Sequence, residues 1–163
     1  MTKLAFALTA LALATTQPAS AAPPVFAETL TFDGVEFSRQ GTGELKARAL
    51  LTAVTICEFG KYQARENTQQ PGPHLLVLRF ARKLSADQVQ QVFRGVVETQ
   101  SGYSDAELKG FLQLLPAVKA DSVVHFRADT AGGLTVFAAN KPLGSLVAPK
   151  LAAALWAGLG TDN

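Results

Sequence analysis

The sequence has few of the side chains that bind metals or form cross-links. Cys57 is the only cysteine among the 163 residues, so the chain cannot close an intramolecular disulfide. His74 and His125 are the only histidines, and their separation of 51 positions fits no metal-binding motif. Cys57 ends a β-leaning run over residues 53–57, where a small core side chain is favoured over a catalytic thiol. We therefore expect no disulfide, no metal site, no cofactor and no Ser/His/Asp triad.

The sequence also has no strong excess of basic or acidic residues. The chain has 15 basic and 13 acidic residues, which gives a net charge of +2. Arg79, Arg82 and Lys83 form one small basic cluster, and three charges around a strand end are usually a solvated edge. A net charge this close to zero provides no general attraction to nucleic acid or to an anionic membrane. We expect neither as a partner.

Long hydrophobic runs are absent except at the N-terminus. There Lys3 precedes an apolar run over residues 4–14, and the small residues Ala19, Ser20 and Ala21 follow. This order is typical of a secretory signal peptide. The apolar run is only about half as long as a membrane-spanning helix of ~20 residues. We therefore expect residues 1–21 to be a signal peptide that is cleaved after Ala21.

Residues 22–163 are then expected to form one exported domain. Hydrophobic residues make up 48% of the sequence, and the length suits a single globular core. The first residue after the cleavage site is not the cysteine that a lipoprotein requires, so we predict no membrane insertion after signal cleavage. The predicted location is periplasmic or secreted.

Turn residues predict two β-hairpins. Asp33-Gly34 lies between residues 29–32 and 35–39 and suits the positive φ angles of a type I′ turn. Ala131-Gly132-Gly133 lies between residues 122–127 and 134–139 in the same way.

Three further stretches are β-leaning or turn-like. Residues 41–43, Gly-Thr-Gly, are expected to break the first hairpin. Residues 45–62 predict one bent strand or two strands with a bulge, with a helix as the alternative because of their alanines. Residues 74–80 are almost continuously apolar, as in a central strand that is covered on both faces.

Two capping boxes predict helices. Ser85 with Gln88, and Ser104 with Glu107, have the spacing in which each side chain caps a backbone amide of the other. These helices should begin at residues 86 and 105, and a last helix should carry Pro149 in its first turn and end at residue 160. Strands, two helices, then strands and a helix indicate an α+β fold, a mainly antiparallel β-sheet with helices packed on one face.

Five short stretches carry a resemblance to a known family. They are Gly-Tyr-Ser-Asp-Ala-Glu at residues 102–107, Leu-Thr-Ala-Val at 51–54, Leu-Arg-Phe-Ala at 78–81, Ser-Ala-Asp-Gln at 85–88 and Leu-Trp-Ala-Gly-Leu-Gly at 155–160. They resemble chalcone isomerases and their bacterial, exported chalcone-isomerase-like relatives, and residues 102–107 are similar to the family's Tyr-Thr-Asp-Ala-Glu segment. Their order and spacing carry the resemblance, which extends over residues 29–160 and implies the same α+β fold.

The resemblance also implies site residues. Tyr103 takes the place of the Tyr that, with water, helps to stabilise charge on the substrate ketone, and Thr52 takes the place of the active-site Thr. The alternative for Tyr103 is a buried side chain with a satisfied hydroxyl, and for Thr52 an ordinary strand residue. The family's catalytic Arg falls on Gln40, and the Asn of many plant enzymes falls on Gly110.

Two arginines near Gln40 are the candidates for replacing the family's Arg. A shift of one residue would bring in Arg39, and Arg48 has the same strand parity as Thr52. Four residues at ~3.3 Å each place Arg48 about 13 Å from Thr52 along an extended strand, too far to serve the same ligand atom.

Three functions are consistent with these residues. The first is a binding protein whose apolar cleft takes a small hydrophobic ligand such as a fatty acid, as non-catalytic relatives do. The second is an isomerase, an intramolecular lyase that closes a ring by adding a phenol oxygen to an enone, with Tyr103 and Thr52 orienting the ketone. The missing Arg counts against it, because Arg supplies a fixed positive charge. The third is a periplasmic interaction partner that needs no ligand.

Overall fold

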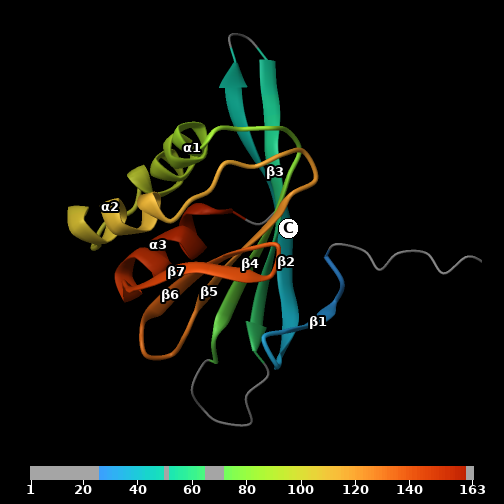
Figure 1. The fold of residues 1–163 in the computed structure, drawn as a ribbon, viewed down its shortest axis with the longest axis vertical. Helices are drawn as coiled ribbons and strands as arrows, with labels where there is room; N and C mark the ends of the chain where they lie inside the picture. Colours follow the sequence, from blue (N-terminus) through green and yellow to red (C-terminus); the bar gives the residue numbers. More distant parts are fainter. Residues whose placement is uncertain (1–25, 50–51, 65–71, 161–163) are drawn as a thin grey trace, which may run out of the picture.

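The computed structural model describes residues 26–49, 52–64 and 72–160. In these residues a seven-stranded antiparallel sheet follows the order of the chain, so each strand pairs with the next one (Figure 1). The strands are β1 (Thr29–Phe32), β2 (Val35–Ala49), β3 (Thr52–Ala64), β4 (His74–Phe80), β5 (Val123–Ala128), β6 (Gly133–Ala138) and β7 (Lys141–Val147). The helices are α1 (Ala86–Glu98), α2 (Asp105–Gln113) and α3 (Pro149–Gly158).

The predicted hairpins are confirmed. Phe32 pairs with Val35 across Asp33 and Gly34, whose φ angles are +50° and +76°. Positive φ at both central residues is the geometry of a type I′ turn, which matches the right-handed twist of the strands. β5 and β6 likewise pair on either side of the glycine-bearing turn at residues 129–132.

The long hairpin of β2 and β3 agrees with one of the predicted alternatives. Residues 45–49 and 52–62 belong to two paired strands with a bulge between Leu45 and Lys46, and they form neither a helix nor one bent strand. The break expected at residues 41–43 was wrong, since β2 continues through it with a bulge at Gln40. Gly43 serves close packing, as a Cβ there would lie 2.6 Å from the ring of Phe59.

Strand β7 had no counterpart in the sequence prediction. It contains Pro142 and Gly144, which weaken a strand pattern, and it lies at an edge of the sheet where proline is tolerated. The turn before it lies at Ala139 and Asn140, whose φ angles are +48° and +61°.

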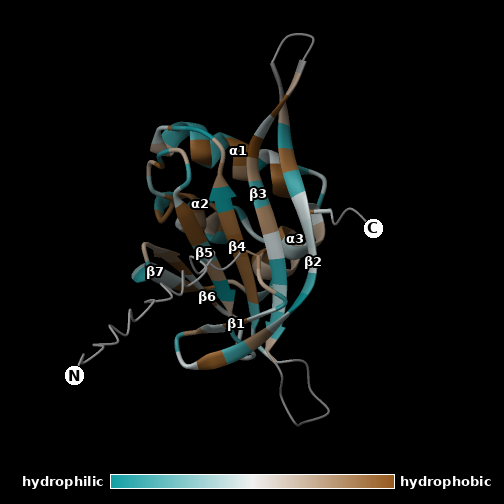
Figure 2. Cartoon of the chain, turned by 90° about the vertical axis from the view of Figure 1, so that its right-hand side faces the viewer, coloured by the Kyte–Doolittle hydropathy of each residue, from teal (hydrophilic) through white to brown (hydrophobic). Residues whose placement is uncertain are grey.

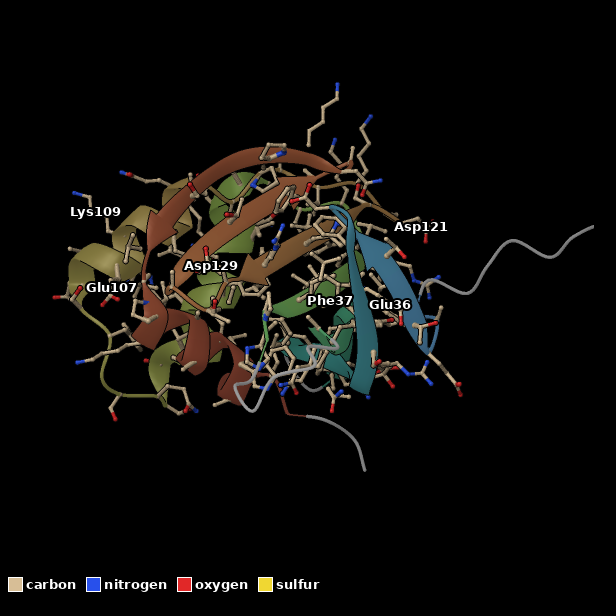
Figure 3. All side chains as sticks on the ribbon, turned by 90° about the horizontal axis from the view of Figure 1, so that it is seen from below. Glu36, Phe37, Glu107, Lys109, Asp121 and Asp129 are labelled. Atoms are coloured by element: carbon tan, nitrogen blue, oxygen red, sulfur yellow. The ribbon has the colours of Figure 1, made fainter. Side chains whose placement is uncertain are left out.

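The helices begin at the predicted residues. Ser85 and Gln88 form one complete capping box, with hydrogen bonds of 2.9 and 3.3 Å. Ser104 and Glu107 form the other, with hydrogen bonds of 2.7 and 3.2 Å (Glu107 is labelled in Figure 3). The last helix carries its proline at the start, as expected, and ends at Gly158, two residues earlier than predicted.

All three helices cover the same face of the sheet (Figure 1). Phe93 of α1, Phe111 of α2 and Phe126 of β5 pack edge to face, with ring centroids 5.1 to 6.2 Å apart. Gly158 lets α3 approach α1, since a Cβ at this position would lie 2.3 Å from the Val96 carbonyl oxygen. Aromatic interlocking and close helix contact together fix this helix-side core.

A second, smaller core lies on the opposite face. Its buried members are Phe32, Phe37, Tyr62, Ala64, Leu75, Val77 and Phe137, which come from β1 to β4 and β6. Phe37 is fully buried while Glu36, the residue before it on β2, is exposed (Figure 3). Successive residues of β4 alternate between the two cores, and most of this strand is apolar (Figure 2). The predicted α+β class, and a central strand covered on both faces, are confirmed.

Candidate functional site

An apolar cavity of about 410 Å³ lies between α3 and the helix-covered face of the sheet. Leu76 of β4, Phe126 of β5 and Leu134 of β6 line it from the sheet. From α3 it is lined by Ala152 and Leu155, among others. Ala152 and Ala153 of α3 contribute only short side chains to its lining. We call it the α3 cavity.

One buried cation lies beside this cavity. Lys61 of β3 pairs with Leu76 of β4, and directly opposed residues of an antiparallel pair place their side chains on the same face, so Lys61 points toward α3. Its Nζ atom donates a hydrogen bond of 2.6 Å to the backbone oxygen of Trp156 and lies 5.3 Å from the centroid of the Trp156 ring. Only 8% of Lys61 is exposed, and burial lowers the pKa of its ammonium group.

The ammonium group of Lys61 retains capacity for a further acceptor. It has three N–H donors, and Trp156 is its one hydrogen-bond partner in the described residues. A buried cation is unfavourable unless an anion or several acceptors surround it. The position therefore suits a carboxylate at the end of the cavity.

His74 and Trp156 form an aromatic wall of the same cavity. Their rings are 4.7 Å apart and tilted by 52°. Burial lowers the pKa of His74, so its imidazole is neutral at physiological pH and can donate or accept one hydrogen bond at each nitrogen. Asp129 also lines the cavity, and it accepts a 2.7 Å hydrogen bond from the amide of Gly133 and so supports the β5–β6 turn (Figure 3).

The arrangement can bind an amphipathic molecule. It offers apolar walls, the neutral imidazole of His74 and the carboxylate of Asp129, and the ammonium group of Lys61 is bonded to the lining residue Trp156. Within residues 26–49, 52–64 and 72–160, no three His, Cys, Asp or Glu side chains are grouped as they would be around a metal ion. No helix in this part of the chain is long and apolar enough to cross a membrane.

The residues predicted from the sequence lie elsewhere. Tyr103 is half-buried against the helix-side core, and its hydroxyl donates a 2.8 Å hydrogen bond to the backbone oxygen of Val97. This is the ordinary alternative considered for it, a packed tyrosine with a satisfied hydroxyl. Tyr103 does not line the α3 cavity.

Arg39 lies on the face of the sheet that carries no helices. It has the strand parity of Phe37, it pairs with Tyr62, and its guanidinium donates to the backbone oxygen of Phe26. The structure therefore does not bring Arg39 together with Tyr103. Gln40 is the bulge residue of β2, and Gly110 of α2 lies close to Leu146 of β7.

Thr52 and Arg48 belong to the far end of the β2–β3 hairpin, which extends beyond the helices (Figure 1). The backbone of Thr52 pairs with Ala49, and that of Arg48 pairs with Ala53. The structure describes the backbone of Thr52 and Arg48 but not their side chains. The signal peptide expected at residues 1–21 lies outside the described residues. The roles assigned to these residues stay predictions.

Comparison with solved structures identifies the fold. The chain matches the crystal structure of a fatty-acid binding protein of Arabidopsis thaliana with a TM-score of 0.62. The match covers 79% of this chain and 87% of that one, at 16% sequence identity. The chain has the chalcone-isomerase-like fold. No protein-family model matches the sequence, and no curated protein matches it.

The sequence analysis did not predict that Lys61 and Trp156 would meet at the α3 cavity of this chalcone-isomerase-like fold. Lys61 shares strand parity with the buried Cys57 and Phe59, and a lysine at an inward position of an apolar strand is unusual. That signal was present in the sequence. Its partner Trp156 was not predictable, because the two residues are 95 positions apart.

Proposed function

We propose that this protein binds a fatty acid or a similar long-chain anion in the α3 cavity. The observation that carries the proposal is an apolar cavity whose lining residue Trp156 accepts a hydrogen bond from the buried ammonium group of Lys61. Its volume of about 410 Å³ lies within the ~300–1,000 Å³ typical of small-molecule sites. The Arabidopsis thaliana protein that shares the fold is a fatty-acid binding protein, which agrees with this ligand class.

Two energy terms should act together in binding. Burial of an acyl chain contributes ~0.8 kcal/mol per CH₂ group, so affinity should rise steeply with chain length until the cavity is filled. A hydrogen bond from Lys61 to a carboxylate contributes about 1.5–3 kcal/mol more, because one partner is charged. The acyl chain of the ligand supplies most of the binding free energy, and its carboxylate fixes the orientation of the ligand.

Calorimetric titration with saturated fatty acids of increasing length tests the proposal. Ala152→Leu places three more carbon atoms in the cavity and should weaken the longest ligands by at least tenfold. Ala157→Leu is the matched control, because Ala157 is exposed on the same helix and does not line the cavity. The control should bind as the wild type does.

Two results would contradict the proposal. Absence of binding at every chain length would reject fatty acids as ligands. Equal binding by wild type and Ala152→Leu would place the ligand outside the α3 cavity, and the cleft predicted around Tyr103 and Thr52 would then be the site to test.

A further inference from the structure

A second hollow lies on the sheet face opposite the helices. It has a volume of about 770 Å³ and is bounded by the end of β1, by β5 and by the turn between β6 and β7. Figure 1 shows β1 on the side of the sheet away from the three helices. We call this hollow the β1 groove. The sheet separates it from the α3 cavity, so the two can be tested independently.

The floor of the β1 groove is a row of three side chains across neighbouring strands. His125 of β5 pairs with Val77 of β4 on one side and with Phe137 of β6 on the other, and all three line the groove. The His125 ring stacks on Phe32 of β1, with centroids 4.4 Å apart and planes 28° apart. Phe32 meets Phe137 edge to face at 5.0 Å. The floor is therefore aromatic and preformed.

The Nδ1 atom of the His125 imidazole lacks a hydrogen-bond partner in the described residues. Only 8% of this residue is exposed, and its Nδ1 atom is buried without a hydrogen bond in the described part of the chain. Buried polar atoms are rarely left unpaired in proteins, and those that are often lie at functional positions. The groove also presents Ser122 and Asn140, which can bond to a polar ligand group at its rim.

The charges around the groove argue against an anionic ligand. Burial lowers the pKa of His125 to about 4, so its ring is neutral at physiological pH. Asp33 lines the groove, but its carboxylate forms an ion pair with Arg127. The nearby Arg127 is therefore already engaged, and none of the described residues that line the groove is a lysine or an arginine.

We propose that the β1 groove binds a small uncharged molecule whose apolar ring packs on Phe32 and Phe137 and whose hydroxyl group hydrogen-bonds to His125. This ligand class differs from that of the α3 cavity. The α3 cavity has the ammonium group of Lys61 next to its lining residue Trp156, whereas the β1 groove has a neutral imidazole beside aromatic rings. The chain would then have two binding sites, one for a long-chain anion and one for a small uncharged molecule.

Three matched probes test the proposal by NMR titration: benzyl alcohol, toluene and benzoate. They share one ring and differ in carrying a hydroxyl, no polar group or a charge. Benzyl alcohol should bind about 3- to 10-fold more tightly than toluene, the gain expected from one neutral hydrogen bond. It should also shift the imidazole nitrogen signals of His125, and benzoate should not.

The variant His125→Phe keeps a ring against Phe32 and removes the hydrogen bond. It should bind toluene and benzyl alcohol equally. If this variant does not fold, the wild-type comparison and the imidazole nitrogen signals are sufficient for the test. Equal affinity of the wild type for the alcohol and toluene, or signal changes confined to the α3 cavity, would overturn the proposal. So would the lack of any saturable change.

Discussion

The Nζ atom of Lys61 lies 2.6 Å from the backbone oxygen of Trp156, to which it donates a hydrogen bond. Lys61 belongs to the middle of the sheet and Trp156 to the last turn of α3. The last carbonyl groups of a helix lack partners within it, and a cation there is favoured by the helix dipole. One lysine thus anchors the end of α3 and provides a charge beside the α3 cavity.

Replacing Lys61 should remove the preference for an anionic ligand. We expect the wild type to bind dodecanoate about tenfold or more tightly than dodecanol, and Lys61→Met to bind both alike. Lys109→Met is the control, since Lys109 is exposed on α2 (Figure 3). Competition titrations with the acid and the alcohol measure the ratio. A preference that survives in Lys61→Met would assign the carboxylate to another residue.

Stability should decrease in acid because of His125. The pKa of this imidazole is about 4 in the folded chain and about 6.5 when it is exposed by unfolding. The unfolded state therefore binds a proton more readily, and stability is lost as pH falls from 6.5 to 4. The difference corresponds to a loss on the order of 3 kcal/mol.

Urea unfolding at several pH values measures this dependence. His125→Phe should flatten the curve between pH 6.5 and 4. His74→Gln should keep the larger part of it, since His74 is less buried than His125. If the free energy of unfolding of the wild type does not change with pH in this range, the pKa of His125 is not lowered by folding.

Tyr103→Phe separates a structural role from a ligand-binding role. Loss of the hydrogen bond to Val97 should lower the free energy of unfolding by about 1 kcal/mol. Fatty-acid affinity should not change if the ligand lies in the α3 cavity. The resemblance to chalcone isomerases predicts the opposite, a loss of affinity in Tyr103→Phe and in Thr52→Val. Titration of both variants with one fatty acid distinguishes the two.

We expect no efficient isomerisation of chalcone. Gln40 stands where the family carries Arg, and it is the bulge residue of β2. Removal of one well-placed charge contact to a transition state costs about 10²–10³ in rate. Loss of the chalcone absorbance with and without protein measures the effect, since chalcone also cyclises slowly in water. A large protein-dependent rate would favour the lyase alternative.

Export can be tested on the natural chain. The signal peptide predicted at residues 1–21 should be removed, so that the mature protein begins at Ala22. Intact-mass analysis of the periplasmic fraction, or of the medium, gives the first residue directly. Full-length protein in the cytoplasm would be the contrary result.

Local signals made much of the fold predictable. A capping box or an Asp-Gly turn involves residues within four positions of one another, so Ser85 with Gln88 and Asp33 with Gly34 could be read directly. The continuation of β2 through Gly43 could not be predicted in this way, because it depends on the ring of Phe59 in the partner strand. Strand β7 escaped prediction for a similar reason, since pairing with β6 forms it despite Pro142.

The candidate site was less predictable than the fold. The sequence predicted a cleft for a hydrophobic ligand, and an apolar cavity is present. The residues that surround it come from β4, β5, β6 and α3, which the fold alone brings together. The inward position of Lys61 could be read from its strand parity, but its contact with Trp156, 95 positions away, could not. The resemblance instead directed attention to Tyr103, whose hydroxyl is bonded to Val97.

The sequential order of the strands has a consequence for folding kinetics. Most neighbouring strands of the sheet are joined by short connections, so hairpin formation requires little loop-closure entropy. The pairing of β4 with β5 differs, because the 42 residues between Phe80 and Val123 include α1 and α2. Closing this loop brings Phe93 and Phe111 against Phe126 in the same event. We expect docking of these two helices to coincide with the slowest step of sheet assembly, so that substitutions at the three phenylalanines change the folding rate more than those in the β1–β2 hairpin.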